Sequence, residues 1–347
     1  LASCPADEMG QAYEYLIGKF ADDAGNTAQE FYTNRTVVTL MAEILQPQPG
    51  ESIYDPTCGS GGMLVKCLDY LRAKGLPWQG VKVFGQEINA LTSSIARMNL
   101  YLNGVEDFSI VCGDTLERPA FVEGSQLRKF DVVLANPPYS ISEWNRSAFE
   151  HDKWSRNKYG TPPQGRADYA FIQHIIASMD DSIGRSAILL PHGILFRGEE
   201  SEVRKNIVLS DKIEAIIGLG PNLFYNAPME ACILIFNNNK SAQLKNKIIF
   251  INAVKEVTRK NAESYLEQLH IEKIFNAYHS VADIENFKRL VDIKEIEENK
   301  FDLSIQKYIF INEITNKYHI STKDAILQWK LSHEILINEY SNLVNLL

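Results

Sequence analysis

The most unusual residues of the chain are an amide, two prolines and a phenol at the end of an apolar segment. Residues 130–136 read FDVVLAN, and Asn136 is followed by Pro137, Pro138 and Tyr139. The prolines hold φ at about −65° and remove two backbone donors, so neither a strand nor a helix continues through them. Asn136, which precedes a proline, is pushed towards an extended conformation. The Asn136 side-chain oxygen and the Pro137 carbonyl are thereby preorganised to accept two hydrogen bonds from a planar conjugated amine.

The chemistry that suits these four residues is methylation of such an amine. Its lone pair is delocalised into a ring, and two accepted N–H bonds let the nitrogen pyramidalise and become nucleophilic. Tyr139 would stack on the face of the ring, which for a nucleobase requires flipping out of the duplex. No strong general base is needed, since the cationic product can lose its proton to water. Taken alone, the four residues could also form a rigid loop without chemistry.

A glycine-rich turn, DPTCGSGGML at residues 55–64, follows a strand-like segment and opens a helix. Gly59, Gly61 and Gly62 allow positive φ and close backbone approach, and the helix N-terminus offers free N–H groups. The turn contains neither the Lys-Ser/Thr of a P-loop nor the G-x-G-x-x-G spacing, so a phosphate site is not predicted. Asp55, directly before the turn, would suit a cationic group such as an α-ammonium.

Two further acids end the next strand-like segments. Glu87 closes FGQE and is placed to accept both hydroxyls of a ribose, while Asp114 in CGDT could accept from an adenine amino group. Each acid alone could instead be a helix N-cap or a solvated loop residue. Three acids at successive strand ends, without a phosphate site, favour S-adenosylmethionine over NAD or ATP.

Alternating strands and helices must position these residues. Strands are expected at 52–55, 81–87, 108–114, 130–136, 185–191, 212–219, 231–237 and 247–253, and helices at 62–74, 90–103, 168–180 and 199–208. This alternation predicts an α/β, Rossmann-like fold with a mostly parallel twisted sheet and helices on both faces. The last two strands come without a helix between them, so an antiparallel strand at one sheet edge is expected.

Three regions follow from the change in pattern along the chain. Residues 1–45 form an N-terminal helical segment with helices at 7–24 and 36–45, residues 46–257 the catalytic domain, and residues 258–347 a C-terminal helical region. The amphipathic helix expected at 321–346 either packs onto its own core or docks onto a partner subunit.

Composition limits the remaining functions. The formal net charge of −9 over 347 residues would repel a polyanion, so action on nucleic acid needs a local basic surface or a more basic partner. Residues 142–166 supply such basic and aromatic character, although a solvated mobile loop explains them as well. The basic residues are Arg146, Lys153, Arg156, Lys158 and Arg166, and the side chains that could stack on bases are Trp144, Trp154 and Tyr159. Five cysteines without CxxC spacing and seven histidines without HExxH predict a reducing cytoplasm and no metal. Neither a membrane-spanning run nor a signal peptide is expected, and the missing initiating Met suggests a processed chain or missing upstream sequence.

Together these stretches resemble the modification (methyltransferase, HsdM-type) subunits of type I restriction-modification systems. The match runs in order over residues 26–255, through GNTAQEFYTNRTVVTLMAEIL, DPTCGSGGML, FGQEIN, GDTL, FDVVLANPPYS, GRADYAFIQH, LPHGILFRGEE and IGLGPNLFYNAPMEACILIFN, and FDLSIQKYIF resembles the segment before the family's helical tail. The resemblance implies a cofactor pocket lined by Glu30, Phe31, Tyr32, Thr33 and Arg35, with Thr33 hydrogen-bonding the methionine part. It implies Asp55, Gly59, Ser60, Gly61 and Gly62 for the methionine moiety, Glu87 for the ribose, Asp114 for the adenine, and Asn136, Pro137, Pro138 and Tyr139 for the target base.

The resemblance also implies an activity and partners. The expected function is transfer of a methyl group from S-adenosylmethionine to the N6 amino group of a flipped-out adenine in double-stranded DNA. A separate specificity subunit would read the sequence, with two modification subunits per specificity subunit, and a restriction/translocase subunit would join for cleavage. The chain departs from the family in its short N-terminal helical region and in Asn34, where proline is common. An RNA or protein-glutamine methyltransferase, or an inactive scaffold fragment, are the alternatives.

Overall fold

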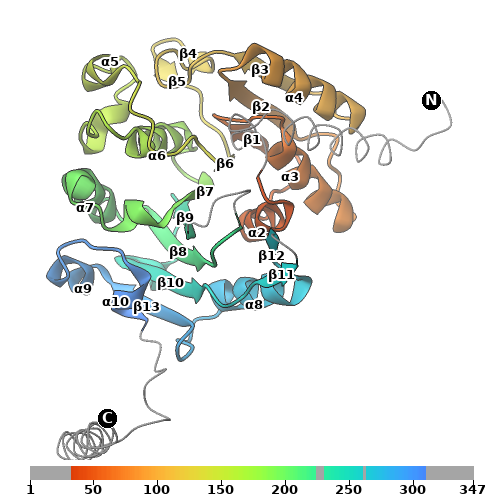
Figure 1. Ribbon diagram of the computed structural model, residues 1–347. Coiled ribbons are helices and arrows are strands. Elements are labelled where there is room, and N and C mark those ends of the chain that lie inside the picture. The colour runs from red at the N-terminus through yellow and green to blue at the C-terminus, as the bar shows by residue number, and fades with distance from the viewer. Residues whose placement is uncertain (1–32, 224–229, 261–262, 310–347) are drawn as a thin grey trace, which may run out of the picture. The chain divides into compact units, whose positions relative to one another are not determined.

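A nine-stranded mixed sheet forms the centre of the fold. The computed structural model describes residues 33–223, 230–260 and 263–309. The strand order across the sheet is β13-β10-β8-β9-β7-β6-β1-β2-β3 (Figure 1). In chain order the strands are β1 (Ser52–Asp55), β2 (Lys82–Glu87), β3 (Phe108–Cys112), β6 (Val132–Ala135), β7 (Arg185–Pro191), β8 (Ile213–Leu219), β9 (Ala231–Asn237), β10 (Lys247–Ala253) and β13 (Lys288–Asp292). Two small hairpins lie outside it, β4 (Val122–Glu123) with β5 (Gln126–Leu127) and β11 (Thr258–Lys260) with β12 (Glu263–Tyr265).

Strand direction confirms a mostly parallel sheet and corrects one detail. Seven strands run parallel, whereas β9 is antiparallel to both β7 and β8, and β13 is antiparallel to β10. Of the two strands expected to place an antiparallel strand at an edge, β9 is antiparallel but internal, and β10 is parallel to β8. The antiparallel edge strand is β13. A connection without a helix does give antiparallel pairing, but it does not determine which gap in the sheet the strand fills.

Helices cover both faces of the sheet. In Figure 1 one face carries α2 (Arg35–Leu45), α3 (Gly62–Ala73), α4 (Ala90–Leu102) and α8 (Gln268–His279), and the other carries α6 (Asp168–Ser178), α7 (Ser201–Leu209), α9 (Ile293–Glu298) and α10 (Ile305–Tyr308). Short helical turns complete the list: α5 (Arg146–Glu150), η2 (Arg156–Tyr159), η3 (His192–Leu195), η4 (Gly198–Glu200) and η5 (Ala242–Leu244). Successive strand residues point to opposite faces, so Ile53 and Val132 pack in the core on the α3 side, and Tyr54 and Val133 in the core on the α6 side.

The C-terminal part of the described chain belongs to the same compact unit. Residues 258–309 belong to the C-terminal helical region expected at 258–347, and they supply β13 to the main sheet and α8 and α10 to its two faces. The compact unit therefore continues to Ile309 rather than ending at 257. The helices expected at 7–24 and 321–346 lie outside the described residues. Within the described ranges, no helix is long and apolar enough to cross a membrane.

Candidate active site

The polar residues singled out by the sequence lie together at the carboxyl ends of neighbouring strands. β1 pairs in parallel with β2 on one side and β6 on the other, with Tyr54 opposite Phe84 and Val133. Neighbouring strands lie about 4.8 Å apart, so the carboxyl ends of these three strands bring Asp55, Glu87 and Asn136 to adjacent positions.

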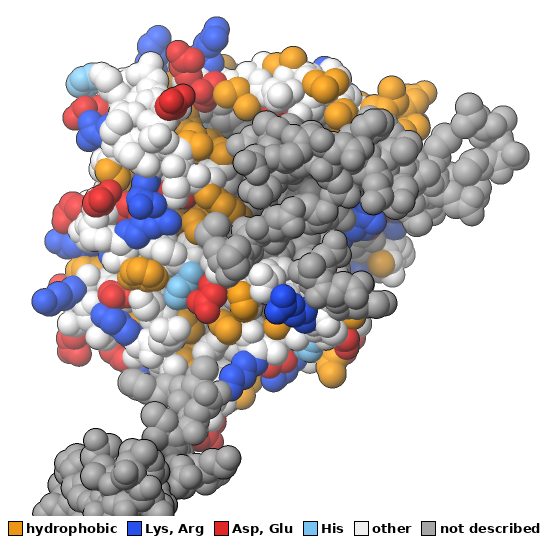
Figure 2. Space-filling view, viewed as in Figure 1, with side chains coloured by type: hydrophobic (Ala, Val, Ile, Leu, Met, Phe, Trp, Pro, Cys, Tyr) orange, Lys and Arg blue, Asp and Glu red, His pale blue; other side chains and the backbone are white. Residues whose placement is uncertain are grey.

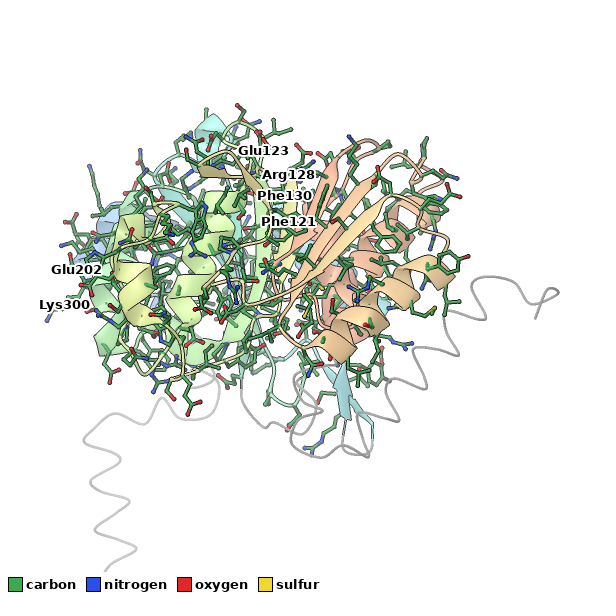
Figure 3. The ribbon with its side chains drawn as sticks, turned by 90° about the horizontal axis from the view of Figure 1, so that it is seen from above. Phe121, Glu123, Arg128, Phe130, Glu202 and Lys300 are labelled. Carbon is green, nitrogen blue, oxygen red and sulfur yellow. The ribbon has the colours of Figure 1, made fainter. Side chains whose placement is uncertain are left out.

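An aromatic cluster supports these three strands from the α6 face. The Tyr54 and Phe130 rings stack with centroids 4.3 Å apart, and Phe121 meets Phe130 edge to face at 5.9 Å. The Arg128 guanidinium lies over the Phe84 ring at 4.2 Å. Figure 3 shows Phe121, Arg128 and Phe130 gathered beside the sheet. Large rings in fixed edge and stacked contacts resist displacement, so the strand ends that carry the site rest on a well-packed base.

The glycine-rich turn wraps closely against β2. Gly61, with φ of +78°, is the N-cap of α3 in a left-handed conformation that favours glycine. The Gly59 N–H donates to Glu87 Oε2 at 3.0 Å, and the Cys58 N–H donates to the Gln86 carbonyl at 2.9 Å. A Cβ on Gly85 would lie 2.9 Å from the Cys58 sulfur. The turn thus depends on a side-chain-free position in the neighbouring strand, a requirement that the turn motif alone does not reveal.

Asp55 is a fully buried carboxyl with one unused oxygen. Its Oδ1 accepts from the Thr57 N–H at 2.9 Å, whereas Oδ2 and the Thr57 hydroxyl are buried without a hydrogen-bond partner in the described part of the chain. Burial, and then the charge of Glu87, raise the pKa of Asp55 from 3.8 to about 7. Two unpartnered acceptors in such a place fit a cationic donor such as an ammonium group, which would favour the ionised carboxyl.

Glu87 and Asp114 lie at the carboxyl ends of β2 and β3, where each also accepts hydrogen bonds from backbone N–H groups. Glu87 accepts from Asn89 N–H at 2.8 Å in addition to Gly59. One oxygen of Asp114 accepts from the Leu116 and Glu117 N–H groups at 2.8 and 3.1 Å, so the capping role left open for it is present. A carboxylate offers about four acceptor positions, and the two bonds to one oxygen of Asp114 leave capacity on this acid for the amino group of a ligand.

An apolar surface next to Glu87 was missed in the sequence. Ile88 is 67% exposed and Leu91, in the first turn of α4, is 72% exposed. A flat ring lying across these side chains would cover apolar area. The available signal was an apolar residue directly after the acid that ends the strand.

The target-site residues are connected to the start of α2. The Asn136 side-chain N–H donates to Thr33 Oγ1 at 2.9 Å, and the Tyr139 hydroxyl donates to Asn136 Oδ1. Thr33 therefore orients the amide, and Tyr139 occupies the oxygen that is needed to accept from an amine. Burial raises the pKa of Tyr139 well above its ordinary value, with Cys232 and Asp168 adding to the effect, so its hydroxyl stays protonated and donating.

A buried charged group holds the backbone after Tyr139. Ser140 has φ of +52°, and its N–H donates to Asp168 Oδ1 at 3.2 Å. Arg166 Nη1 donates to the Ser140 hydroxyl at 3.1 Å, and Arg197 Nη1 lies 3.5 Å from Asp168 Oδ2. Burial, and then Asp168, raise the pKa of Glu200, next to Arg197, to about 7. These contacts were not expected from the sequence, which signals only an acid in the first turn of α6.

The segment 142–166 is exposed over much of its length but is fixed to the fold by buried residues. Arg156 is buried and pairs with Asp152 at 2.6 Å, while its guanidinium also donates to the Thr115 and Leu116 carbonyls at 2.9 and 2.7 Å. The Trp144 indole N–H donates to the Gln164 carbonyl at 2.9 Å. The structure therefore removes Arg156 from the basic residues expected to serve a nucleic-acid surface, because its charge is paired with Asp152 inside the fold.

The other residues predicted for the site lie as follows. At the carboxyl edge of β1, β2, β3 and β6, or against it, are Thr33, Asp55, Gly59, Ser60, Gly61, Gly62, Glu87, Asp114, Asn136, Pro137, Pro138 and Tyr139. Arg35 begins α2, and Glu30, Phe31 and Tyr32 lie outside the described residues. No group of three or more potential metal ligands occurs among the described residues.

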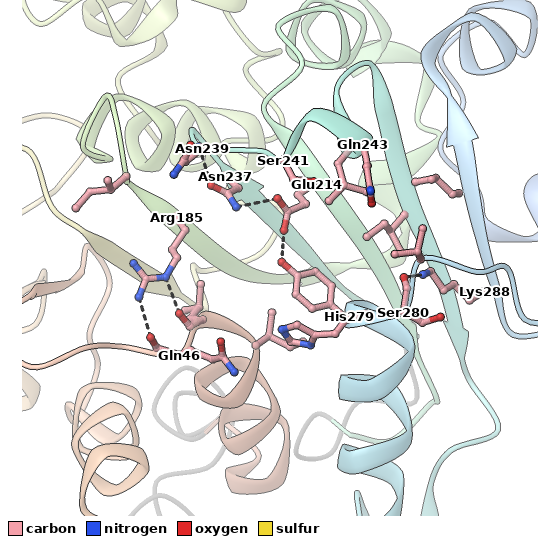
Figure 4. A pocket seen from close by; sticks show the side chains of 18 of the residues that line it. Gln46, Arg185, Glu214, Asn237, Asn239, Ser241, Gln243, His279, Ser280 and Lys288 are labelled. Carbon is pink, nitrogen blue, oxygen red and sulfur yellow. Dashed lines mark hydrogen bonds between the residues drawn. The ribbon is translucent and has the colours of Figure 1, made fainter. Parts of the chain in front are cut away.

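A cavity of about 580 Å³ lies near the opposite ends of the strands, between α2, α8 and the sheet (Figure 4). Glu214 accepts there from the Asn237 side chain at 2.8 Å and from the Tyr278 hydroxyl. Arg185 donates to the Glu51 carboxylate and to the Gln46 carbonyl. These charged groups satisfy one another, in contrast to the unpartnered oxygen of Asp55, so the catalytic candidate remains the carboxyl edge.

Comparisons with known proteins agree with this geometry. The family model described as N-6 DNA Methylase matches residues 5–317. The type I restriction enzyme MjaVII methylase subunit of Methanocaldococcus jannaschii is 35% identical over 337 residues, covering 93% of this chain and 56% of the relative. The HindI methylase subunit of Haemophilus influenzae is 31% identical, covering 87% of this chain and 68% of the relative. The crystal structure of a type I restriction-modification methyltransferase subunit from Streptococcus thermophilus superposes with a TM-score of 0.79 at 36% identity, covering 88% of this chain and 64% of that one. The chain thus spans little more than half the length of the first of these relatives. Because the family model matches most of its residues, the chain belongs to the N-6 DNA methylase family.

Proposed function

We propose that this chain carries the catalytic site of a DNA (adenine-N6) methyltransferase that uses S-adenosylmethionine. The observation that carries the proposal is that an unpartnered, buried carboxylate oxygen and an oriented amide lie at the carboxyl ends of two paired strands. The unpartnered Asp55 oxygen ends β1, and the Asn136 amide follows β6, the strand paired with β1. A cation pocket and an amine-accepting pocket one strand apart suit a reaction between a cationic methyl donor and a conjugated amine.

The described residues fit this cofactor. Asp55 Oδ2 and the Thr57 hydroxyl would take the ammonium group, and the backbone of Gly59, Ser60, Gly61 and Gly62 would lie along the methionine part. Glu87 would hold the ribose hydroxyls, Asp114 the adenine amino group, and Ile88 the adenine face. Thr33 and Arg35, with Glu30, Phe31 and Tyr32, are proposed to close the methionine side. When bound, the cofactor supplies an electrophilic methyl group.

The chain's own residues would then prepare the acceptor. Tyr139 must leave Asn136 Oδ1 as a flipped adenine enters, because that oxygen and the Pro137 carbonyl are the proposed acceptors for the two N6 hydrogens. Thr33 keeps the Asn136 oxygen facing the base by binding its nitrogen. The freed Tyr139 ring can stack on the adenine. Fixed acceptors of this kind lower the barrier by preorganisation and need no proton-abstracting side chain, since the methylated amine loses its proton to water.

The proposed partners follow from the relatives and from charge. The matched relatives are named methylase subunits of type I restriction enzymes. The chain has a net charge of −9, and the face in Figure 2 mixes acidic and basic side chains rather than gathering basic ones. We therefore propose a separate specificity subunit that reads double-stranded DNA, two modification subunits per specificity subunit, and a restriction/translocase subunit for cleavage, all in the cytoplasm.

Calorimetric titration with S-adenosylmethionine, followed by methyl-transfer assays with the specificity subunit, tests the proposal. Asp55→Ala should abolish binding, whereas Asn136→Ala should bind the cofactor normally and lose transfer to DNA. Transfer of labelled methyl groups to ribosomal RNA or protein, but not to DNA, would instead support an RNA or protein-glutamine methyltransferase. A wild type that binds no cofactor would contradict the proposal and favour an inactive scaffold.

A further inference from the structure

A second pocket, of about 440 Å³, lies on the α6 side of the sheet, and four of its fifteen lining residues are lysines. Lys129 precedes β6 and Lys212 precedes β8, so the pocket lies at the amino ends of these strands. Asn136 is at the other end of β6, seven residues and roughly 20 Å from Lys129 at a strand rise of about 3.3 Å per residue. We propose that this pocket binds a ligand with clustered phosphate groups, an oligophosphate or a nucleoside polyphosphate, at a site separate from the methyl-transfer site.

The pocket has an excess of positive charge. Its single acidic lining residue, Asp181, is paired with Lys129 at 3.0 Å and has a side chain that is 82% exposed. Arg156 also lines the pocket, but Asp152 neutralises it inside the fold. In the part of the chain that the structure describes, no carboxylate lies within ion-pair distance of the three other lining lysines, Lys153, Lys158 and Lys212. This cluster occurs on a chain whose net charge is −9.

Lys212 shows that the lysines influence one another. Its side chain is partly buried, and its Nζ donates to Asn238 Oδ1, a neutral acceptor. Burial lowers the pKa of Lys212, and the like charge of Lys158 lowers it further. Asp181 raises it in part, and Lys129 lowers it to a smaller extent than either of these charges. Bringing cations together in a partly desolvated place costs free energy. The carboxylate of Asp181 offsets that cost only in part, because the pKa of Lys212 remains lowered, and a multiply charged anion between the lysines would offset it further.

The pocket wall is already formed. The Tyr159 N–H donates to Gln173 Oε1 at 3.0 Å, and the Gln173 side-chain N–H donates to the Gly160 carbonyl at 2.8 Å, fixing η2 to α6. The buried Arg156 fixes the same segment from the other side. Trp154 also lines the pocket and adds an aromatic ring. The volume lies within the range of about 300–1,000 Å³ that small-molecule sites occupy, so little ordering is required on binding.

Calorimetric titration with sodium tripolyphosphate and, separately, with ATP tests the proposal. The double variant Lys153→Gln/Lys158→Gln should bind both ligands at least about tenfold more weakly than wild type, since each lysine contributes a charged hydrogen bond to phosphate. The matched control, Lys82→Gln/Lys294→Gln, removes the same charge from exposed positions outside the pocket and should bind as wild type does. S-adenosylmethionine titration of all three proteins separates a folding defect from loss of this site.

Amine-reactive labelling read by mass spectrometry locates the ligand. Tripolyphosphate or ATP should protect Lys153, Lys158 and Lys212 and leave Lys82 and Lys294 reactive. A higher affinity for ATP than for tripolyphosphate would identify a nucleoside polyphosphate as the ligand, and equal affinities would identify the phosphate chain alone. The proposal is overturned by non-saturable binding, by equal weakening in the control variant, or by protection from a DNA duplex but from neither small ligand.

Discussion

Replacing Asp55 by asparagine should stabilise the cofactor-free chain at alkaline pH while removing the proposed ammonium site. Burial and Glu87 raise the pKa of Asp55 from 3.8 to about 7 in the folded chain. A raised folded-state pKa favours folding fully below about pH 4, and that contribution is lost progressively as the pH rises through 7. At about 1.4 kcal/mol per pKa unit, the ionised carboxyl costs the fold about 4 kcal/mol above pH 7 and about 2 kcal/mol at pH 5.5.

The asparagine retains the acceptor for Thr57 N–H but buries an NH2 group without a partner, at a cost of about 1–3 kcal/mol. That cost is the same at every pH. The difference in unfolding free energy between Asp55→Asn and wild type should therefore shift by about 2 kcal/mol in favour of the variant between pH 5.5 and pH 8. Urea unfolding at the two pH values measures this shift.

The exposed Asp107, before β3, offers a matched control. Asp107→Asn makes the same chemical change and should alter stability by less than about 0.5 kcal/mol at both pH values. An Asp55→Asn effect that is equal at pH 5.5 and pH 8 would refute the reasoning. In wild type, S-adenosylmethionine affinity should rise about tenfold per pH unit up to pH 7 and then level off, because the ammonium binds the ionised carboxyl. Asp55→Asn should show weak binding without this pH dependence.

Three further changes test individual contacts. Thr33→Val should lower methyl transfer about tenfold at unchanged cofactor affinity, because the hydroxyl orients the Asn136 amide. Thr33→Ser should restore the transfer. A parallel loss of cofactor affinity in calorimetry would assign Thr33 to the cofactor instead. Tyr139→Phe should keep methyl transfer within about threefold of wild type, and Tyr139→Ala should lower it tenfold or more. The reason is that the ring, rather than the hydroxyl, is needed once the base has entered. Equal losses for the two variants in a labelled-methyl assay would contradict this role of the ring. Arg156→Met should lower the free energy of unfolding in urea by about 3–5 kcal/mol, because it leaves Asp152 buried without its partner. Adding Asp152→Asn should restore part of this loss. A loss below about 1 kcal/mol would show that the pair contributes little.

Much of the fold could be predicted because parallel strands covered on both faces are largely apolar, as in β6 and, apart from one or two polar residues, β8 and β10. β13 could not be predicted in this way. Three of the five residues in its sequence, KRLVD, are charged, as an edge strand that pairs on one side only allows, and its partner β10 lies more than thirty residues earlier. The internal position of β9 likewise depends on pairing with both β7 and β8, which no local pattern records.

The parts of the site that lie within one short motif could be predicted. The contacts between residues far apart in the sequence could not. The glycine-rich turn and the strand-end acids each lie within a short motif. The Asn136–Thr33 bond joins residues 103 positions apart, and no spacing rule suggests it. Arg156 was misinterpreted because arginine is usually exposed. Its burial requires an acid four residues earlier and carbonyls about forty residues away, which only the folded chain brings together.

Helix α2 is fixed by side-chain hydrogen bonds at both of its ends. At its C-terminal end, Arg185 donates to the Leu45 and Gln46 carbonyls. At its N-terminal end, the Asn34 side chain donates to the Ser264 carbonyl at 2.8 Å. A force applied through the chain before Thr33 is therefore expected to leave the helix in place and to act first on the Thr33–Asn136 bond. Mechanical load from a neighbouring subunit could reach the target amide by this route without any rearrangement of the sheet.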